Sequence, residues 1–207
     1  MFRAGAQRVV EPGPVVTYAG PIMELIRPTT LHLPSYVQAL ERGWSPDTGR
    51  VEAAREELAR IAEDPAGFLA QQEDREAAGP PIVLPDGSTV NRLPGYRRWM
   101  WDGEFAGSIG FRWQPGTTEL PPTCLGHIGY SVVPWKRNRG YATMALRLLL
   151  PEVGREGLPF VELTTDPANL PSQRVIEANG GVLVERFSLA EQHGGGVGLR
   201  YRIFLGE

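Results

Sequence analysis

Hydrophobic residues recur at helical spacing in three segments of this chain. Between residues 48 and 62 the apolar positions follow one another every three or four residues, as Val51, Ala54, Leu58 and Ile61. This spacing predicts an amphipathic helix whose glutamate-rich face lies in water. A second helix is predicted over residues 33–42 and a third over 143–156, where Pro151 removes one helical hydrogen bond and predicts a kink or a break.

Compact runs of apolar and β-branched residues predict strands before, between and after these helices. The strands expected are residues 23–27, 96–101, 105–113, 125–133, 160–165, 182–188 and 199–205. Asp102-Gly103 separates the second from the third and is a strong hairpin signal. Residues 79–95 are rich in proline and glycine and predict a long loop or a small hairpin, a kind of segment that is often functional. The order of elements predicts an α/β (α+β) protein with a mixed β-sheet and helices on both of its faces.

Length and composition favour a single domain. A chain of 207 residues that is 42% hydrophobic buries one core. We expect the domain over residues 23–207, preceded by an aperiodic N-terminal extension over residues 1–22. The net charge of −3 argues against a nucleic-acid surface. The single cysteine, Cys124, cannot form an internal disulfide, and no apolar run reaches membrane-spanning length. We therefore expect a cytoplasmic protein without nucleic-acid or membrane partners.

The segment 131–142 predicts an anion site. An apolar run ends at Pro134, a short basic loop follows, and a helix is predicted to open just after Gly140. The free N–H groups of a helix's first turn and the helix dipole attract anions, and the basic side chains of the loop add positive charge. We expect a pyrophosphate as the ligand. A plain basic surface turn that ends in glycine is the alternative, whereas the spacings of a Walker loop and of a dinucleotide fingerprint are absent.

A second block follows from residue 160 to residue 184. Here a predicted strand leads into a loop, in which Asn169 is suited to cap a helix and Pro171 is tolerated in the first helical turn. Asn179-Gly180-Gly181 ends that helix with residues that accept left-handed dihedral angles.

The spacing Arg137-x-x-Gly140-x-Ala142 resembles the acyl-CoA pyrophosphate loop of the GNAT superfamily of N-acetyltransferases. The second block resembles the segment that follows this loop in the family. His127 to Ser131 and Val175 to Gly181 look most like a group of uncharacterised bacterial predicted acetyltransferases. The resemblance extends over roughly residues 23–205. It implies a mostly antiparallel sheet of about seven strands, with a splayed central strand pair and helices on both faces.

The same resemblance implies an N-acetyltransferase. Acetyl-CoA would be the acyl donor, a primary amine would attack it directly in a ternary complex, and no metal would take part. The implied CoA-binding residues are the backbone of Val132 together with Arg137, Asn138, Arg139, Gly140, Tyr141, Ala142, Thr143 and, from the other side of the pantetheine arm, Asn169. Part of the acceptor pocket is expected in residues 79–95.

The sequence offers few candidates for the general base and the general acid of this reaction. His127 occupies the position where many family members carry a glutamate as general base, and its ordinary pKa of about 6.5 suits that role. A histidine that satisfies a neighbour in the core is the equal alternative. At the position of the family's acidic tyrosine this chain has Ile176, which cannot donate a proton. Ser172 and Tyr130 are the nearest hydroxyl candidates, although a thiolate can also leave without a dedicated acid.

Other functions stay open at this point. A non-catalytic acyl-CoA-binding or regulatory module would keep the loop and lose the acid–base groups. A transferase that uses succinyl-CoA or another acyl-CoA would keep both. A nucleotide-binding protein without acyl transfer would need a metal-binding acid near the loop, and none is apparent in the sequence. A small-molecule amine, an antibiotic, a peptide N-terminus and a lysine cannot be ranked as acceptors, and a homodimer is also left open.

Overall fold

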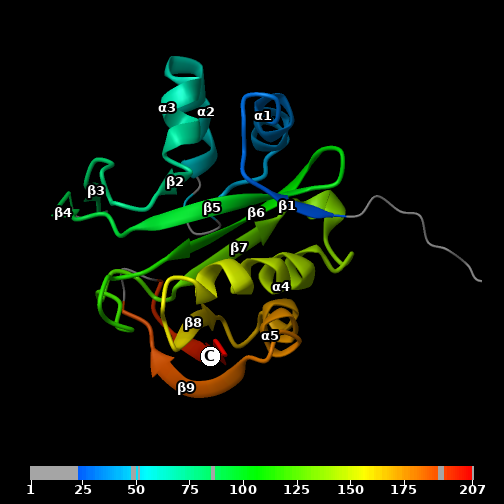
Figure 1. Ribbon diagram of the computed structural model, residues 1–207. Helices are drawn as coiled ribbons and strands as arrows, with labels where there is room; N and C mark the ends of the chain where they lie inside the picture. The colour runs from blue at the N-terminus through cyan, green and yellow to red at the C-terminus, as the bar shows by residue number, and fades with distance from the viewer. Residues whose placement is uncertain (1–22, 48–49, 51, 85–86, 191–193, 207) are drawn as a thin grey trace, which may run out of the picture.

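The computed structural model describes residues 23–47, 50, 52–84, 87–190 and 194–206. The extension expected over residues 1–22 lies outside this part of the chain. Two β-sheets stand side by side, with α1, α2 and α3 on one side of the first sheet and α4 and α5 on the other (Figure 1). Of the helices described, none combines the length and the apolarity that crossing a membrane requires.

The first sheet has the strand order β1-β5-β6-β7, and a short strand β2 pairs with the N-terminal end of β5. Its strands are β1 (Glu24–Ile26), β2 (Glu73–Asp74), β5 (Gly95–Trp101), β6 (Phe105–Arg112) and β7 (Ile128–Val132). The turn at residues 102–104 closes the β5–β6 hairpin, as predicted. All pairings in this sheet are antiparallel.

The second sheet has the order β8-β10-β9 and is also antiparallel. It consists of β8 (Phe160–Thr165), β9 (Val182–Ser188) and β10 (Val197–Phe204). A separate small hairpin, β3 (Ile82–Val83) with β4 (Thr89–Val90), lies in the segment predicted as a loop or small hairpin. The mostly antiparallel architecture is confirmed. The predicted central strand pair is β7 and β8, which belong to two different sheets.

The helices are α1 (Leu33–Glu41), α2 (Ala53–Glu63), α3 (Pro65–Ala70), α4 (Tyr141–Gly154) and α5 (Leu170–Glu177). A single 3-10 turn, η1 (Pro134–Lys136), follows β7. The predicted break at Pro151 is wrong, because α4 continues to Gly154. Pro151 lies in the last turn, and Val153 beyond it is fully buried, so packing holds the helix together at this point. The short elements α3 and β2 were not predicted.

Two hydrophobic cores lie on the two faces of the first sheet. Successive side chains of a strand point to opposite faces, and β5 follows this rule: Trp99 packs toward α1 and Met100 toward α4. The ring of Tyr36 stacks on Trp99, with 4.2 Å between ring centroids. On the other face, Ala145, Leu146 and Leu149 of α4 are fully buried and follow the helical spacing of apolar residues on which this helix was predicted.

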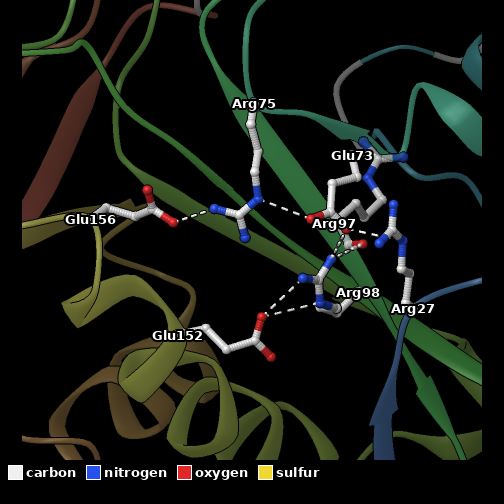
Figure 2. A network of polar contacts seen from close by, with 7 residues as sticks. All are labelled: Arg27, Glu73, Arg75, Arg97, Arg98, Glu152 and Glu156. Carbon is white, nitrogen blue, oxygen red and sulfur yellow. Dashed lines mark hydrogen bonds and ion pairs between the residues drawn. The ribbon is translucent and has the colours of Figure 1, made fainter.

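Charged residues connect the C-terminal part of α4 to the first sheet (Figure 2). Arg98 of β5 is 8% exposed and binds Glu152 of α4, with 3.0 Å between Nη2 and Oε2. Its Nη1 also lies 3.2 Å from Oε2 of Glu73, and Arg75 bridges Glu73 and Glu156. This network fixes the far end of α4, and the near end of the same helix forms part of the candidate site.

Candidate active site

The two sheets meet at His127 and part beyond it. The backbone N–H of His127 donates to the Glu162 carbonyl of β8 at 2.7 Å, and the Glu162 N–H donates to Nδ1 of His127 at 3.0 Å. β7 begins at Ile128 and not at the predicted residue 125. Toward β6, the His127 carbonyl accepts from the backbone N–H of Arg112, and the Val133 N–H donates to the Ala106 carbonyl. Antiparallel pairing alternates in direction, so the peptide groups of Tyr130 and Val132 face the gap between the sheets.

A cleft of about 700 Å³ follows this gap. Its walls come from β7, the basic loop and the first turns of α4 and α5. The residues that line it are Tyr130, Ser131, Val132, Lys136, Arg137, Asn138, Gly140, Tyr141, Ala142, Thr143, Asn169, Pro171, Ser172, Arg174 and Val175. The tertiary structure thus brings most of the predicted cofactor residues together around one space, and the two candidates for the acid, Tyr130 and Ser172, line the same space. His127 and Arg139 are predicted site residues that do not line it.

The N-terminus of α4 opens into the cleft with unpaired donors. Gly140 caps the helix with φ 78°, a left-handed conformation that side chains rarely adopt, and Met144 is the first residue whose N–H bonds back to it. Within the described residues, the N–H groups of Tyr141, Ala142 and Thr143 have no hydrogen-bond partner. Three free N–H groups at a helix N-terminus form a site for an anion such as a phosphate.

Lys136 does not contribute the free positive charge that the sequence suggested. Its side chain is 5% exposed, and Nζ lies 2.5 Å from Oδ1 of Asp102 and 2.8 Å from Oε1 of Glu104. Tyr141, the first residue of α4, donates its hydroxyl to Oδ2 of Asp102 at 2.6 Å. Burial alone would raise the pKa of Asp102, but the hydrogen bonds from Lys136 and Tyr141 and the lysine charge lower it. The tip of the β5–β6 hairpin therefore holds the basic loop in place.

Exposed arginines supply positive charge in and beside the cleft. Arg137 lines it from the loop and Arg174 lines it from α5 on the other side, while Arg139 lies on the loop outside the lining. Arg137 donates from Nε to the Val132 carbonyl at 3.3 Å, and Arg139 donates to the Trp135 carbonyl at 3.4 Å. Sequence reasoning missed Arg174. Its place on the predicted helix after Asn169, one turn from that cap, was the available signal.

Asn169 caps α5 as predicted. Its side-chain oxygen accepts from the Ser172 N–H at 3.2 Å, and its exposed side chain lines the cleft. The cap uses the amide oxygen, and the described residues offer the amide NH₂ no hydrogen-bond partner. One side chain thus carries both a helix cap and a donor at the cleft.

Tyr130 and Ser172 meet in the cleft from β7 and α5. Their hydroxyl oxygens are 2.9 Å apart, although 42 residues separate them in the chain. Burial raises the pKa of Tyr130 to about 12, while the hydrogen bond to Ser172 acts in the opposite direction. The phenol therefore keeps its proton at neutral pH and can donate a hydrogen bond.

His127 lies at the junction of the two sheets and is fully buried. Because Nδ1 accepts a backbone N–H, the neutral ring carries its proton on Nε2, which is buried and has no partner among the described residues. Burial lowers the pKa of His127; the charge of Glu162 opposes this and that of Arg112 adds to it. The imidazole is held neutral in this position, away from the lining of the cleft. The base role stays a prediction.

Comparison with known proteins bears on the same region of the chain. The family model described as an acetyltransferase (GNAT) domain matches residues 25–182, which include the cleft and the basic loop. No curated protein matches this sequence.

Solved structures of similar fold are acetyltransferases of low sequence identity. One is the acetyltransferase from Salmonella typhimurium that modifies the N-terminal serine of ribosomal protein L7/L12, at 15% identity and a TM-score of 0.59, covering 89% of this chain and 95% of that chain. Another is RimJ of Mycobacterium smegmatis in complex with CoA-disulfide, at 18% identity and a TM-score of 0.58, covering 89% and 83%. A third is the microcin C7 self-immunity acetyltransferase MccE in complex with acetyl-CoA and AMP, at 12% identity and a TM-score of 0.58, covering 88% and 92%. At these identities the likeness shows the fold.

Proposed function

Because this chain belongs to the GNAT family of acetyltransferases, we propose that it transfers an acetyl group from acetyl-CoA to a primary amine in a ternary complex. The observation that carries the proposal is the cleft, in which three free N–H groups of α4 lie beside exposed arginines. A pyrophosphate matches this arrangement of donors and charge. The comparison structures that contain CoA or acetyl-CoA have the same fold.

The gap between β7 and β8 suits the pantetheine arm. The arm carries amide groups, and the peptide groups of Tyr130 and Val132 face the gap as a strand edge does. Asn169 offers a further donor from the opposite wall. The cofactor would therefore lie with its pyrophosphate at Gly140 and its thioester near the point where the sheets join.

The reaction needs few groups from the protein. The neutral amine attacks the thioester carbonyl, the C–N bond forms, the C–S bond breaks, and the proton lost by the amine ends on the CoA sulfur. Holding the two reactants together accounts for up to about 7–11 kcal/mol of the barrier. Tyr130 and Ser172 would donate a hydrogen bond to the leaving sulfur. With a pKa of about 12, Tyr130 is too weak an acid to protonate a thiolate fully.

His127 is the other candidate in this scheme. As a base through Nε2 the ring would need the other neutral tautomer, in which Nδ1 carries the proton and the hydrogen bond from the Glu162 N–H is lost. The geometry supports its role as a joint between the sheets more strongly. The amine would then arrive neutral or give its proton to water.

The experiment that tests the proposal compares two aspartates introduced in the same backbone conformation. Gly140 and Gly116 have φ values of 78° and 77°, and a side chain added at either meets nothing within 4 Å. Gly140→Asp places a negative charge at the N-terminus of α4, whereas Gly116→Asp places it away from the cleft. We expect Gly140→Asp to raise the Kd of acetyl-CoA at least about tenfold in a calorimetric titration, and Gly116→Asp to leave it unchanged.

Equal affinities of the two variants would contradict the proposed CoA site. A panel of primary amines, with release of the CoA thiol as the readout, then tests catalysis. Tight binding of acetyl-CoA without turnover of any amine would identify the non-catalytic binding module. That alternative draws some support from Ile176, a buried residue that cannot act as the family's acid.

A further inference from the structure

A second cavity lies on the opposite face of the first sheet from α4. Its volume is about 290 Å³, and it lies among β5, β6, α2 and the β3–β4 hairpin. Arg97, Gly110 and Arg112 line it, and so do Tyr96 and Phe111, which also belong to the core on the α4 side. Ile82, Leu84 and Val90 come from the segment 79–95 and form part of its wall.

Gly110 lines this cavity and has no side chain that would fill it. Arg97 pairs with Gly110 across β5 and β6, and Gly110 pairs with Gly129 across β6 and β7. A Cβ added at Gly129 would lie 3.4 Å from Nη2 of Arg112. The guanidinium of Arg112 therefore reaches from β6 over β7, two residues beyond His127. This is where β7 leaves β8 and the gap for the thioester begins.

Positive charge exceeds negative charge around the cavity. Among the described residues, four arginines line it, Arg60, Arg92, Arg97 and Arg112, against the two acids Glu57 and Asp74. Arg97 pairs with Glu57 at 3.4 Å, Arg92 approaches Asp74 at 3.9 Å, and Arg60 binds the amide of Gln71. Within the described part of the chain, the guanidinium of Arg112 has no hydrogen-bond or ion-pair partner.

We infer that this cavity binds the amine acceptor and that the acceptor carries an anionic group, a carboxylate or a phosphate, which Arg112 holds. This inference rests on the proposed acetyl transfer. A guanidinium offers paired donors that match both anions, and it is most useful where no protein carboxylate already occupies it. Arg112 meets that condition and lies beside the strand along which the thioester would arrive. Its contact with the anion would leave the amine at the other end of the acceptor free to enter the gap.

The test uses pairs of amines in which one member carries an anionic group distant from the amino group and the other carries a neutral group there. Para-(aminomethyl)benzoate beside para-(aminomethyl)benzamide tests a carboxylate, and para-(aminomethyl)phenyl phosphate beside para-(aminomethyl)phenol tests a phosphate. Release of the CoA thiol from acetyl-CoA gives kcat/KM for each amine. We expect the anionic member of at least one pair to be favoured about tenfold or more, as a hydrogen-bonded ion pair allows.

Three variants connect this preference to Arg112. Arg112→Gln brings the two members of a pair to within about twofold of each other, and Arg112→Lys keeps part of the preference because the charge remains. Arg112→Glu reverses it, so that para-(aminomethyl)benzylamine becomes the better acceptor. The control is Arg55→Gln, which removes the same charge from the exposed Arg55–Glu52 pair on α2 and leaves the preference intact.

Two outcomes overturn the inference while the proposed function stands: turnover that favours the neutral or cationic amines in the unmodified protein, and a preference for anions that survives Arg112→Glu. Failure of acetyl-CoA to bind, or binding without turnover of any amine, refutes the proposed acetyl transfer itself and this inference with it. A titration with acetyl-CoA alone detects the failure to bind, and the absence of CoA thiol release with every amine detects binding without turnover; the first two outcomes show both binding and turnover.

Discussion

At the scale of single residues, Asp102 does more than form a turn. Its carboxylate is nearly enclosed, and each oxygen has a partner on a different part of the cofactor loop: Nζ of Lys136 and the hydroxyl of Tyr141. The hairpin tip is thereby linked to both sides of Gly140. Asp102 holds the loop through Lys136 and Tyr141, and in the proposed site it would act on a bound pyrophosphate only through these residues.

Asp102→Asn keeps a residue that suits the turn but removes the charge that pairs with Lys136. We expect the KM for acetyl-CoA to rise about three- to tenfold while kcat changes little, because the loop is displaced and the thioester is not. The free energy of unfolding falls by about 1–3 kcal/mol, since Glu104 still partners the buried lysine. Steady-state kinetics and urea unfolding measure the two effects.

Glu104→Gln is the matched control, because it removes the other carboxylate of Lys136 from the same hairpin, where Glu104 is half exposed. It leaves Tyr141 and its contact with Asp102 in place. A KM for acetyl-CoA that rises equally in both variants would show that Asp102 has no special role in positioning the loop.

At the scale of elements, α4 and α5 both begin at the cleft, but their N-termini are capped differently. Gly140 offers α4 no side-chain cap, so the first N–H groups of that helix are left for a ligand. Asn169 caps α5 with its own side chain. Of the two helices, the one without a cap is thus the one that faces the proposed pyrophosphate.

Variants of Asn169 separate its capping role from its binding role. Asn169→Asp keeps an acceptor for the Ser172 N–H, whereas Asn169→Ala loses it at a cost of about 1 kcal/mol. If the Asn169 amide also donates to the pantetheine arm, both variants weaken acetyl-CoA binding although only the alanine variant is less stable. Calorimetric titration and thermal unfolding measure the two properties.

The control for lost capping is Asp64→Ala at α3, where the Asp64 side chain accepts from the Gly67 N–H at 2.9 Å. It removes a cap far along the chain from the cleft residues, so acetyl-CoA affinity should not change. Normal binding of acetyl-CoA by Asn169→Asp would reduce Asn169 to a helix cap.

At the scale of the whole molecule, the function depends on two sheets that join at one point and separate beyond it. The joint consists of the backbone of His127 and Glu162 and the ring of His127. The gap on one side of the joint suits the cofactor, and the cavity under Arg112 lies over β5 and β6 on the face of the first sheet opposite α4. A neutral, buried imidazole at the joint makes the stability of this arrangement depend on pH.

The sign of that dependence follows from the pKa of His127, which burial lowers in the folded state. The unfolded chain takes up a proton as pH falls through about 6.5, while the folded chain takes it up only at lower pH, so stability is lost on acidification. Between pH 7.5 and 5.5 we expect His127 to contribute a loss of at most about 1.4 kcal/mol. His127→Gln should be less stable at pH 7.5 and should show a pH slope smaller by this amount in urea unfolding. Identical slopes would show that the ring titrates normally, as an accessible base would.

The local elements of this protein follow from its sequence. The apolar stripe of α4, the hairpin at Asp102-Gly103 and the cap at Asn169 each depend on residues within a few positions of one another, so the spacing alone predicts them. The loop around Gly140 is predictable for the same reason, because its geometry and its free N–H groups are properties of one strand-to-helix turn. The family resemblance added the splayed pair of strands.

Other features depend on contacts between distant parts of the chain, which no local pattern specifies. Asp102 meets Lys136 and Tyr141, Tyr130 meets Ser172, and Arg112 lies over Gly129 only because the strands pair in one register and the helices pack in one order. Burial decided the rest. The same packing that enclosed Lys136 and His127 left the Arg112 guanidinium without a partner among the residues that the structure describes. The charge and accessibility of a side chain are set by the neighbours that the fold brings to it.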